Sequence, residues 1–140
     1  LAYAPPYSSA KDPVNMAGFI AENIKNGLVK QFTYEEIPSL RQRDDVILLD
    51  TRTPNEYARG CAKGFINIPL DSLRERLSEL DTSKKIYVMC QSGLRSYLST
   101  RILVQNGFDA YNFVGGYRLY ASIKNEETLS KQCYSCGMDK

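Results

Sequence analysis

The feature that most constrains this chain is a short apolar run that leads into a cysteine, a glycine-containing loop and a helix-like pattern. Residues 85–89, Lys-Ile-Tyr-Val-Met, have the composition of a buried strand, and Cys90 follows directly. Residues 96–107 have a helical pattern that stops at Gly107. A strand, a tight loop and a helix N-terminus in that order predict N–H groups that point inward beside the thiol. Because these groups and the helix dipole carry partial positive charge, we expect them to stabilise a thiolate.

The loop, residues 90–96, reads Cys-Gln-Ser-Gly-Leu-Arg-Ser. Arg95 lies five positions after Cys90 and adds a full positive charge that would hold a negative sulfur species on the cysteine. We therefore predict that Cys90 is a nucleophile. The alternative is a buried structural cysteine in front of an ordinary helix.

Composition narrows the chemistry. The 140-residue chain has no histidine, which excludes a Cys-His or Ser-His pair and any histidine-ligated metal, so we expect no metal site. Its four cysteines are unevenly spaced and do not resemble a secreted disulfide framework. The net charge is +2, and the lysine and arginine residues are spread along the chain rather than clustered. Neither nucleic acid nor a membrane is therefore an expected partner. No secretory signal is visible, and we expect a cytoplasmic protein. The first residue, Leu1, suggests a fragment of a longer polypeptide.

The sequence predicts three parts, residues 1–29, 30–124 and 125–140. In the first part, Asp12 is a typical N-cap, Pro13 a typical first helical residue, and a glycine at position 27 is placed to end the helix. The second part alternates strand and helix signals. Strands are predicted at 45–50, 65–68, 86–89 and 110–114, and helices at 33–40, 53–57, 72–80, 96–106 and 117–123.

This alternation predicts an α/β fold, a parallel sheet of about five strands with helices on both faces. Asp71 is expected to cap the 72–80 helix. The side chains expected to face inward are Leu73, Leu77 and Leu80 in that helix and Leu98, Ile102 and Leu103 in the 96–106 helix. Because ligands bind at the carboxyl ends of parallel strands, the predicted site is the edge where Cys90 falls.

The Cys-x4-Arg loop resembles the active loop of the rhodanese family of sulfurtransferases, whereas related phosphatases use Cys-x5-Arg. Further landmarks are similar to that family in order and spacing: Asp-Thr-Arg at 50–52 with Glu56-Tyr57, Gly60 through Pro69, and Gly115-Gly116. The resemblance covers residues 30–124 and implies a rhodanese-like fold.

The resemblance also implies a mechanism. The Cys90 thiolate would take the outer sulfur of thiosulfate, a polysulfide or a persulfide, and a thiol or cyanide would remove it. Arg95 would orient an anionic donor, or hold the loop in shape through an ion pair. The substrate-binding loop positions are Gln91, Ser92, Gly93, Leu94 and Ser96. Asp50 and Arg52 would support the site, and Arg52 could form an ion pair with Glu56.

Three further cysteines have open roles. Cys61 stands where many rhodaneses carry histidine; it is either a small hydrophobe under the sheet or a second sulfur-handling thiol. Cys133 and Cys136 form a CxxC pair past the expected domain end. That pair is either a redox or sulfur-relay pair or part of a tail without a role.

Residues 1–19 read Leu-Ala-Tyr-Ala-Pro-Pro-Tyr-Ser-Ser-Ala-Lys-Asp-Pro-Val-Asn-Met-Ala-Gly-Phe. This run begins a match, over about the first 25 residues, that resembles the end of the dimerisation domain of coenzyme A-disulfide reductases and related NADH oxidases. These are flavoproteins, some with a rhodanese domain fused at this point. The resemblance implies FAD, NADH and coenzyme A in the full-length protein, none of them bound by this fragment, and a homodimer. It also implies that the flavoprotein portion reduces the sulfur carried by Cys90. Alternatives are a non-catalytic persulfide carrier, a Cys-dependent phosphatase or arsenate reductase, and an interaction module.

Overall fold

The computed structural model describes residues 12–133, and the chain divides into two compact units, residues 1–30 and 31–140. The described part of the first unit, residues 12–30, contains helix α1, Pro13–Lys25. Its N-cap is Asp12, as predicted, whose carboxylate accepts the N–H groups of Val14 at 2.8 Å and Asn15 at 3.3 Å. Gly27 follows the helix with a φ of +66°. The segment before Asp12, which carries much of the flavoprotein resemblance, lies outside the described residues.

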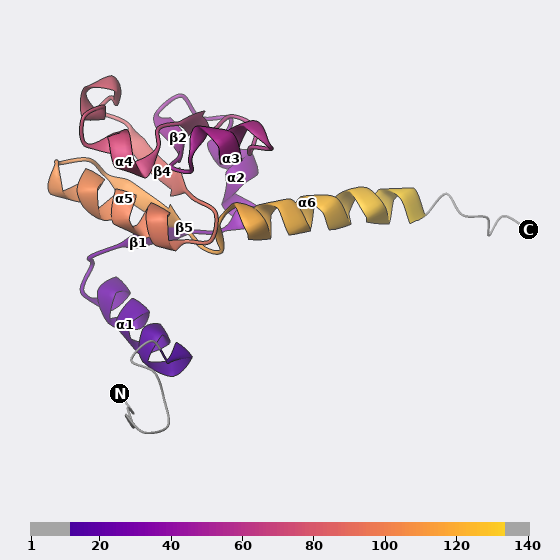
Figure 1. The fold of residues 1–140 in the computed structure, drawn as a ribbon, viewed down its shortest axis with the longest axis horizontal. Helices are drawn as coiled ribbons and strands as arrows, with labels where there is room; N and C mark the ends of the chain where they lie inside the picture. Colours follow the sequence, from indigo (N-terminus) through magenta and orange to yellow (C-terminus); the bar gives the residue numbers. More distant parts are fainter. Residues whose placement is uncertain (1–11, 134–140) are drawn as a thin grey trace, which may run out of the picture. The chain divides into compact units, whose positions relative to one another are not determined.

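The second unit is built on a five-stranded parallel sheet, which confirms the predicted fold class (Figure 1). The strands are β1 (Lys30–Phe32), β2 (Val46–Asp50), β3 (Ile66–Asn67), β4 (Lys85–Met89) and β5 (Ala110–Phe113). Their order across the sheet is β1-β5-β4-β2-β3. Strand β4 is central, with β2 and β5 paired parallel on its two sides. The residue after β4 therefore leaves from the middle of the sheet's carboxyl edge.

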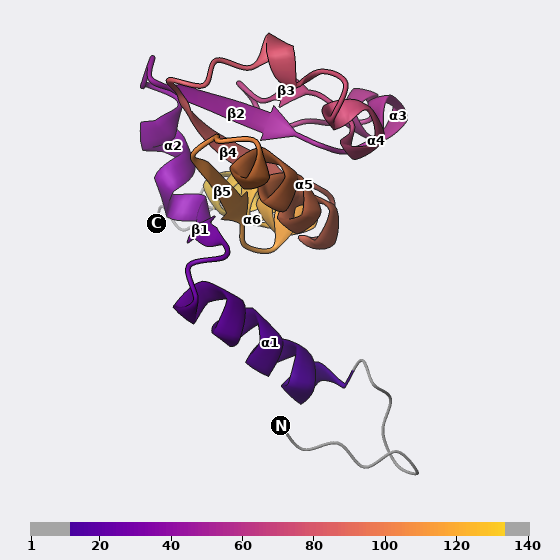
Figure 2. The same cartoon turned by 90° about the vertical axis from the view of Figure 1, so that its left-hand side faces the viewer.

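Helices cover both faces of the sheet. They are α2 (Ile37–Leu40), α3 (Pro54–Ala58), α4 (Leu70–Leu73), α5 (Leu94–Gln105) and α6 (Gly116–Cys133), with 3₁₀ turns at Tyr34–Glu36 and Leu77–Glu79. Figure 2 shows α2 and α5 on opposite sides of the strands. Among the described residues, no helix combines the length and the apolar character that crossing a membrane requires.

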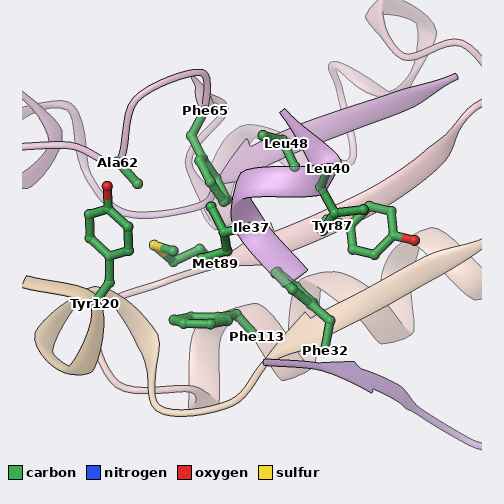
Figure 3. Packing of buried hydrophobic residues seen from close by; sticks show 10 residues of the cluster. All are labelled: Phe32, Ile37, Leu40, Leu48, Ala62, Phe65, Tyr87, Met89, Phe113 and Tyr120. Atoms are coloured by element: carbon green, nitrogen blue, oxygen red, sulfur yellow. The ribbon is translucent and has the colours of Figure 1, made fainter. Parts of the chain in front are cut away.

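Alternation along the strands divides the buried side chains between two cores. In β4, Tyr87 and Met89 point into the core beneath α2 and α6, whereas Ile86 and Val88 point into the core beneath α4 and α5. Figure 3 shows the first core, in which Phe32 lies edge-on to Tyr87 with ring centroids 5.0 Å apart. Because β4 is buried on both faces, the backbone that leads into Cys90 is rigidly held.

The predicted helix at 72–80 is wrong. Helix α4 covers only Leu70–Leu73, its N-cap is Pro69 rather than Asp71, and a separate 3₁₀ turn follows at Leu77–Glu79. The three leucines of the pattern nevertheless face the second core, with Leu73 and Leu80 buried and Leu77 partly buried. Two short turns satisfy the same apolar spacing as one helix, and packing on the sheet decides between them.

Helix α5 begins at Leu94, two residues earlier than predicted, and buries Ile102 and Leu103 as expected. Leu98 is 42% exposed, so its predicted inward position is wrong. The buried stripe instead includes Ser96, Ser99 and Thr100, small polar residues that allow the helix to approach the sheet closely. Helix α6 continues to Cys133, past the predicted domain end at 124.

Candidate functional site

Cys90 lies at the carboxyl end of β4 with only 1% of its surface exposed. Two donors reach its sulfur: the Gly93 N–H, with N and Sγ 3.1 Å apart, and the Ser96 hydroxyl, with Oγ and Sγ 3.2 Å apart. Gly93 is the residue before α5 and has a φ of +116°, which a side chain would disfavour. The loop therefore presents the sulfur with hydrogen-bond donors that suit a thiolate or a persulfide anion.

The N-terminus of α6 supports the cysteine loop through backbone hydrogen bonds. The N–H of Tyr117 donates to the Cys90 carbonyl at 2.7 Å, and the N–H of Arg118 donates to the Gln91 carbonyl at 3.2 Å. Gly116 lies against the loop so closely that an added Cβ would meet backbone atoms of Gln91 and Ser92 at 2.6 Å. Gly116, the second residue of the Gly115-Gly116 pair, thus packs directly against the backbone of the cysteine loop.

Arg95 is held in a bidentate ion pair with Glu56. Each terminal guanidinium nitrogen lies 2.7 Å from a carboxylate oxygen, and both side chains are about 30% exposed, 31% for Arg95 and 29% for Glu56. The carboxylate also accepts the N–H of Thr53 at 3.0 Å and its hydroxyl at 2.9 Å, which caps α3. The hydrogen bonds from Arg95, against the opposing effect of burial, lower the pKa of Glu56 to about 2. The ion pair therefore persists at any ordinary pH.

Asp50 and Arg52 form a second ion pair at the end of β2, and both are essentially fully buried. The Arg52 guanidinium donates to both Asp50 oxygens, with a shortest distance of 2.7 Å, and to the Gly60 carbonyl at 2.8 Å. It also reaches the Gln91 side-chain oxygen at 3.3 Å and lies 3.9 Å from the centre of the Tyr117 ring. Arg52 thus connects β2, the cysteine loop and α6.

The predicted ion pair between Arg52 and Glu56 is wrong. Arg52 reaches Glu56 at its backbone carbonyl, 3.5 Å away, and not at its carboxylate. The carboxylate that pairs with Arg52 belongs to Asp50. The reason is geometric: Asp50 is the last residue of β2, and its carboxylate accepts both the N–H and the guanidinium of the residue two positions on. Glu56 is left to face Arg95 across the site.

The remaining predicted site residues are spread around the loop. Gln91 is half-buried, Ser92 is exposed, and Leu94 is 69% exposed in the first turn of α5. Cys61 is exposed, so its interpretation as a small hydrophobe under the sheet is wrong. It follows Gly60 in the loop after α3, and its thiol contributes, after burial, to a raised pKa of the Tyr57 phenol. The neighbouring Ala62 is the residue that points into the core.

The CxxC pair is only partly in view. Cys133 is the last residue of α6, and Cys136 lies outside the described residues. Within residues 12–130, whose side chains are described, there is no cluster of three cysteine, aspartate or glutamate side chains that could hold a metal ion.

Sequence reasoning missed two contributions to the site. The predicted partner of Glu56 is Arg52, and nothing local identifies Arg95, 39 positions away, as its actual partner. Tyr117 follows the glycine pair and covers Arg52 with its ring. A capping box, Thr53 with Glu56 three residues later, is the one sequence signal that could have fixed the Glu56 carboxylate at the start of α3.

Fold and site together define a class: an α/β domain with a buried cysteine whose sulfur accepts hydrogen bonds from its own loop, in a chain without histidine. The sequence profile of the Rhodanese-like domain family matches residues 33–122. The chain therefore belongs to the rhodanese-like family, and a sulfurtransferase or persulfide function is the activity that this membership supports.

Two solved structures are similar over most of the chain. CoADR-RHD of Bacillus anthracis, in its reduced form, is 48% identical with a TM-score of 0.80 over 90% of this chain, and the match covers 22% of that protein. A NAD-dependent persulfide reductase from A. fulgidus is 40% identical with a TM-score of 0.64 over 83% of this chain, covering 20% of that protein. The chain thus spans about a fifth of each. These matches confirm the resemblance to a rhodanese module of a coenzyme A-disulfide reductase-type protein.

A sulfurtransferase of Allochromatium vinosum is 35% identical over 88 residues, which are 59% of this chain and 82% of that relative. Its own length is therefore mostly accounted for by the rhodanese-like part of the present chain.

Proposed function

We propose that this chain is a thiol-dependent sulfurtransferase domain in which Cys90 carries a sulfane sulfur as a persulfide. The observation that carries the proposal is the buried Cys90 sulfur at the end of β4, within reach of the Gly93 N–H and the Ser96 hydroxyl. A sulfur atom attached to Cys90 would extend from this donor-lined position. The same donors that stabilise a thiolate would then serve the terminal sulfur of the persulfide.

The reaction proceeds by two displacements. The Cys90 thiolate attacks the outer sulfur of a donor such as thiosulfate, a polysulfide or an organic persulfide. The donor's sulfur–sulfur bond breaks, and sulfite or a thiolate leaves with the electron pair while a Cys90–sulfur bond forms. A thiol acceptor or cyanide then attacks the terminal sulfur and regenerates the Cys90 thiolate. Covalent catalysis replaces one difficult transfer by two easier ones.

In the full-length protein we infer that this transfer is coupled to reduction. FAD, NADH and coenzyme A would bind in a flavoprotein portion outside the present sequence, and that portion would reduce the coenzyme A-disulfide or persulfide. Such a protein would be a homodimer that meets small-molecule sulfur donors and thiol acceptors in the cytoplasm. The similarity to CoADR-RHD and to a NAD-dependent persulfide reductase supports this part of the proposal.

A second candidate, a persulfide carrier with little turnover, is favoured by the burial of Cys90. A terminal sulfur under cover would be protected from free acceptors and delivered to a docked partner. The phosphatase alternative is disfavoured, because the four-residue spacing is short for a phosphate and both terminal nitrogens of Arg95 already bind Glu56.

Intact-mass spectrometry after brief treatment with thiosulfate or polysulfide tests the proposal. We expect a gain of one sulfur that cyanide removes and that Cys90→Ser abolishes. The rate of loss to thiols then separates enzyme from carrier. A chain that gains no sulfur on Cys90 is not a sulfurtransferase of this kind. Sulfur that persists in Cys90→Ser would place the reaction at another cysteine.

A further inference from the structure

Two ion pairs lie beside the Cys90 loop. Arg95 is paired with Glu56, and Arg52 is paired with Asp50. The other residues of the loop after Cys90, at positions 91–94 and 96, carry no charge. Once Cys90 is ionised, these groups together have a net charge of −1, although two guanidinium groups stand beside the site.

We propose that Glu56 sets the donor selectivity of Cys90. By occupying Arg95, its carboxylate disfavours dianionic donors such as thiosulfate and favours sulfane-sulfur donors that carry one negative charge or none. This inference rests on the proposed sulfurtransferase function and assigns the discrimination to a residue outside the cysteine loop.

The Arg95 fork is the group that would grip two oxygens of a dianionic donor. Both of its terminal nitrogens are instead 2.7 Å from Glu56 oxygens. A donor that approached Arg95 would have to displace a carboxylate or share the guanidinium with it. Sharing places like charges side by side in a partly buried site, where their repulsion exceeds that in bulk water.

Glu56 cannot easily move aside. The oxygen that accepts one Arg95 nitrogen also accepts the N–H and hydroxyl of Thr53, so a rotation away from Arg95 would uncap α3. The carboxylate therefore stays in place whether or not a donor is bound. A free glutamate could have swung out to admit an anion, whereas this one is fixed from the opposite side.

Two sulfur donors of similar shape allow the effect of the donor's charge to be measured separately. Thiosulfate is a dianion, and methanethiosulfonate is a monoanion in which a methyl group replaces one oxygen. In both, Cys90 attacks the outer sulfur, and sulfite or methanesulfinate leaves with the electron pair. The rate of thiocyanate formation with cyanide gives kcat/KM for each donor on the 140-residue chain.

Glu56→Gln is the decisive variant. We expect it to raise the ratio of kcat/KM for thiosulfate over methanethiosulfonate by about tenfold, the order expected for removing one like charge from a partly buried site. Glu79→Gln is the matched control. Glu79 forms an equally short bidentate pair with Arg76, in a turn that precedes β4, and its loss should leave the ratio unchanged. An unchanged ratio in Glu56→Gln, or an equal loss with both donors, would overturn the inference.

Salt dependence of the wild-type chain provides a test that needs no variant. Screening weakens repulsion more for a dianion than for a monoanion, so the thiosulfate ratio should rise between low and high ionic strength. A ratio that falls with salt would mean that a cation attracts the dianion, and the inference would be wrong. A mass gain on Cys90 with methanethiosulfonate, whatever the ratio, leaves the proposed function standing. The absence of any mass gain with methanethiosulfonate, thiosulfate and polysulfide alike refutes that function itself.

Discussion

Replacing Gly116 by alanine tests whether the start of α6 supports the cysteine loop. Gly116 has a φ of +66°, and a Cβ there would lie 2.6 Å from the carbonyl carbon and oxygen of Gln91 and from the Ser92 nitrogen. All three contacts are to backbone, so no side chain can rotate away. Relief requires a shift of the loop that carries Cys90 or of the first turn of α6.

The magnitude follows from two costs. A non-glycine residue in the left-handed region costs about 1–2 kcal/mol. Forcing an extra methyl group into a filled space adds about 1–3 kcal/mol. Gly107→Ala separates them, because Gly107 has a φ of +86° and nothing within 4 Å of the added Cβ. We therefore expect Gly107→Ala to lower the free energy of unfolding by the first amount and Gly116→Ala by the sum, about 2–5 kcal/mol.

Urea unfolding followed by circular dichroism measures both variants, and peptide-resolved alkylation by iodoacetamide reports the Cys90 environment. Gly116→Ala should also change the Cys90 alkylation rate, because the Cys90 and Gln91 carbonyls accept N–H groups from the same turn. Gly107→Ala should not. Equal stability losses with an unchanged Cys90 rate in both variants would refute the claim that Gly116 holds the loop.

Three further predictions concern the charged and polar partners. The pKa of Glu56 falls from 4.5 to about 2 on folding, so the stability that the ionised Glu56 gives the folded chain is complete above about pH 5 and is lost as pH falls toward 2. The difference in urea midpoint between the wild-type chain and Glu56→Gln should therefore shrink over that pH range. Asp50→Asn or Arg52→Met alone should each destabilise by about 3–5 kcal/mol in urea unfolding, and the double variant by less than their sum. Ser96→Ala removes a hydroxyl from the Cys90 sulfur and should slow persulfide formation by about tenfold, followed by mass spectrometry.

Four of the five strands were predictable because their signals are local, whereas the short edge strand β1 was not predicted. The strands at β2, β4 and β5 are short runs of apolar residues between turn signals, and parallel strands buried on both faces read in this way. The start of α1 was equally local, since Asp12 and Pro13 cap a helix through contacts within three residues. The helix predicted at 72–80 failed because an apolar spacing does not distinguish one helix from two turns on the same core.

The partners within the site were not predictable from the same signals. Arg95 and Glu56 are 39 positions apart, as are Arg52 and Gln91, and only the order of strands in the sheet brings them together. The exposure of Cys61 is a similar case, because the register of its loop places Ala62 rather than the cysteine in the core. Local reasoning identified the residues that carry chemistry, but their pairing depends on tertiary structure.

The two arginines differ in burial, and their roles at the site differ accordingly. Arg52 is fully buried, and its many partners make it a fixed connection between β2, the loop and α6. Arg95 is 31% exposed, so a donor can approach it, but only in the presence of Glu56. The partly exposed Arg95–Glu56 pair is therefore the place where the charge that a donor meets can be changed, because the buried Asp50–Arg52 pair is held from several sides. Donor preference can thus vary at position 56 while the Cys90 loop stays the same.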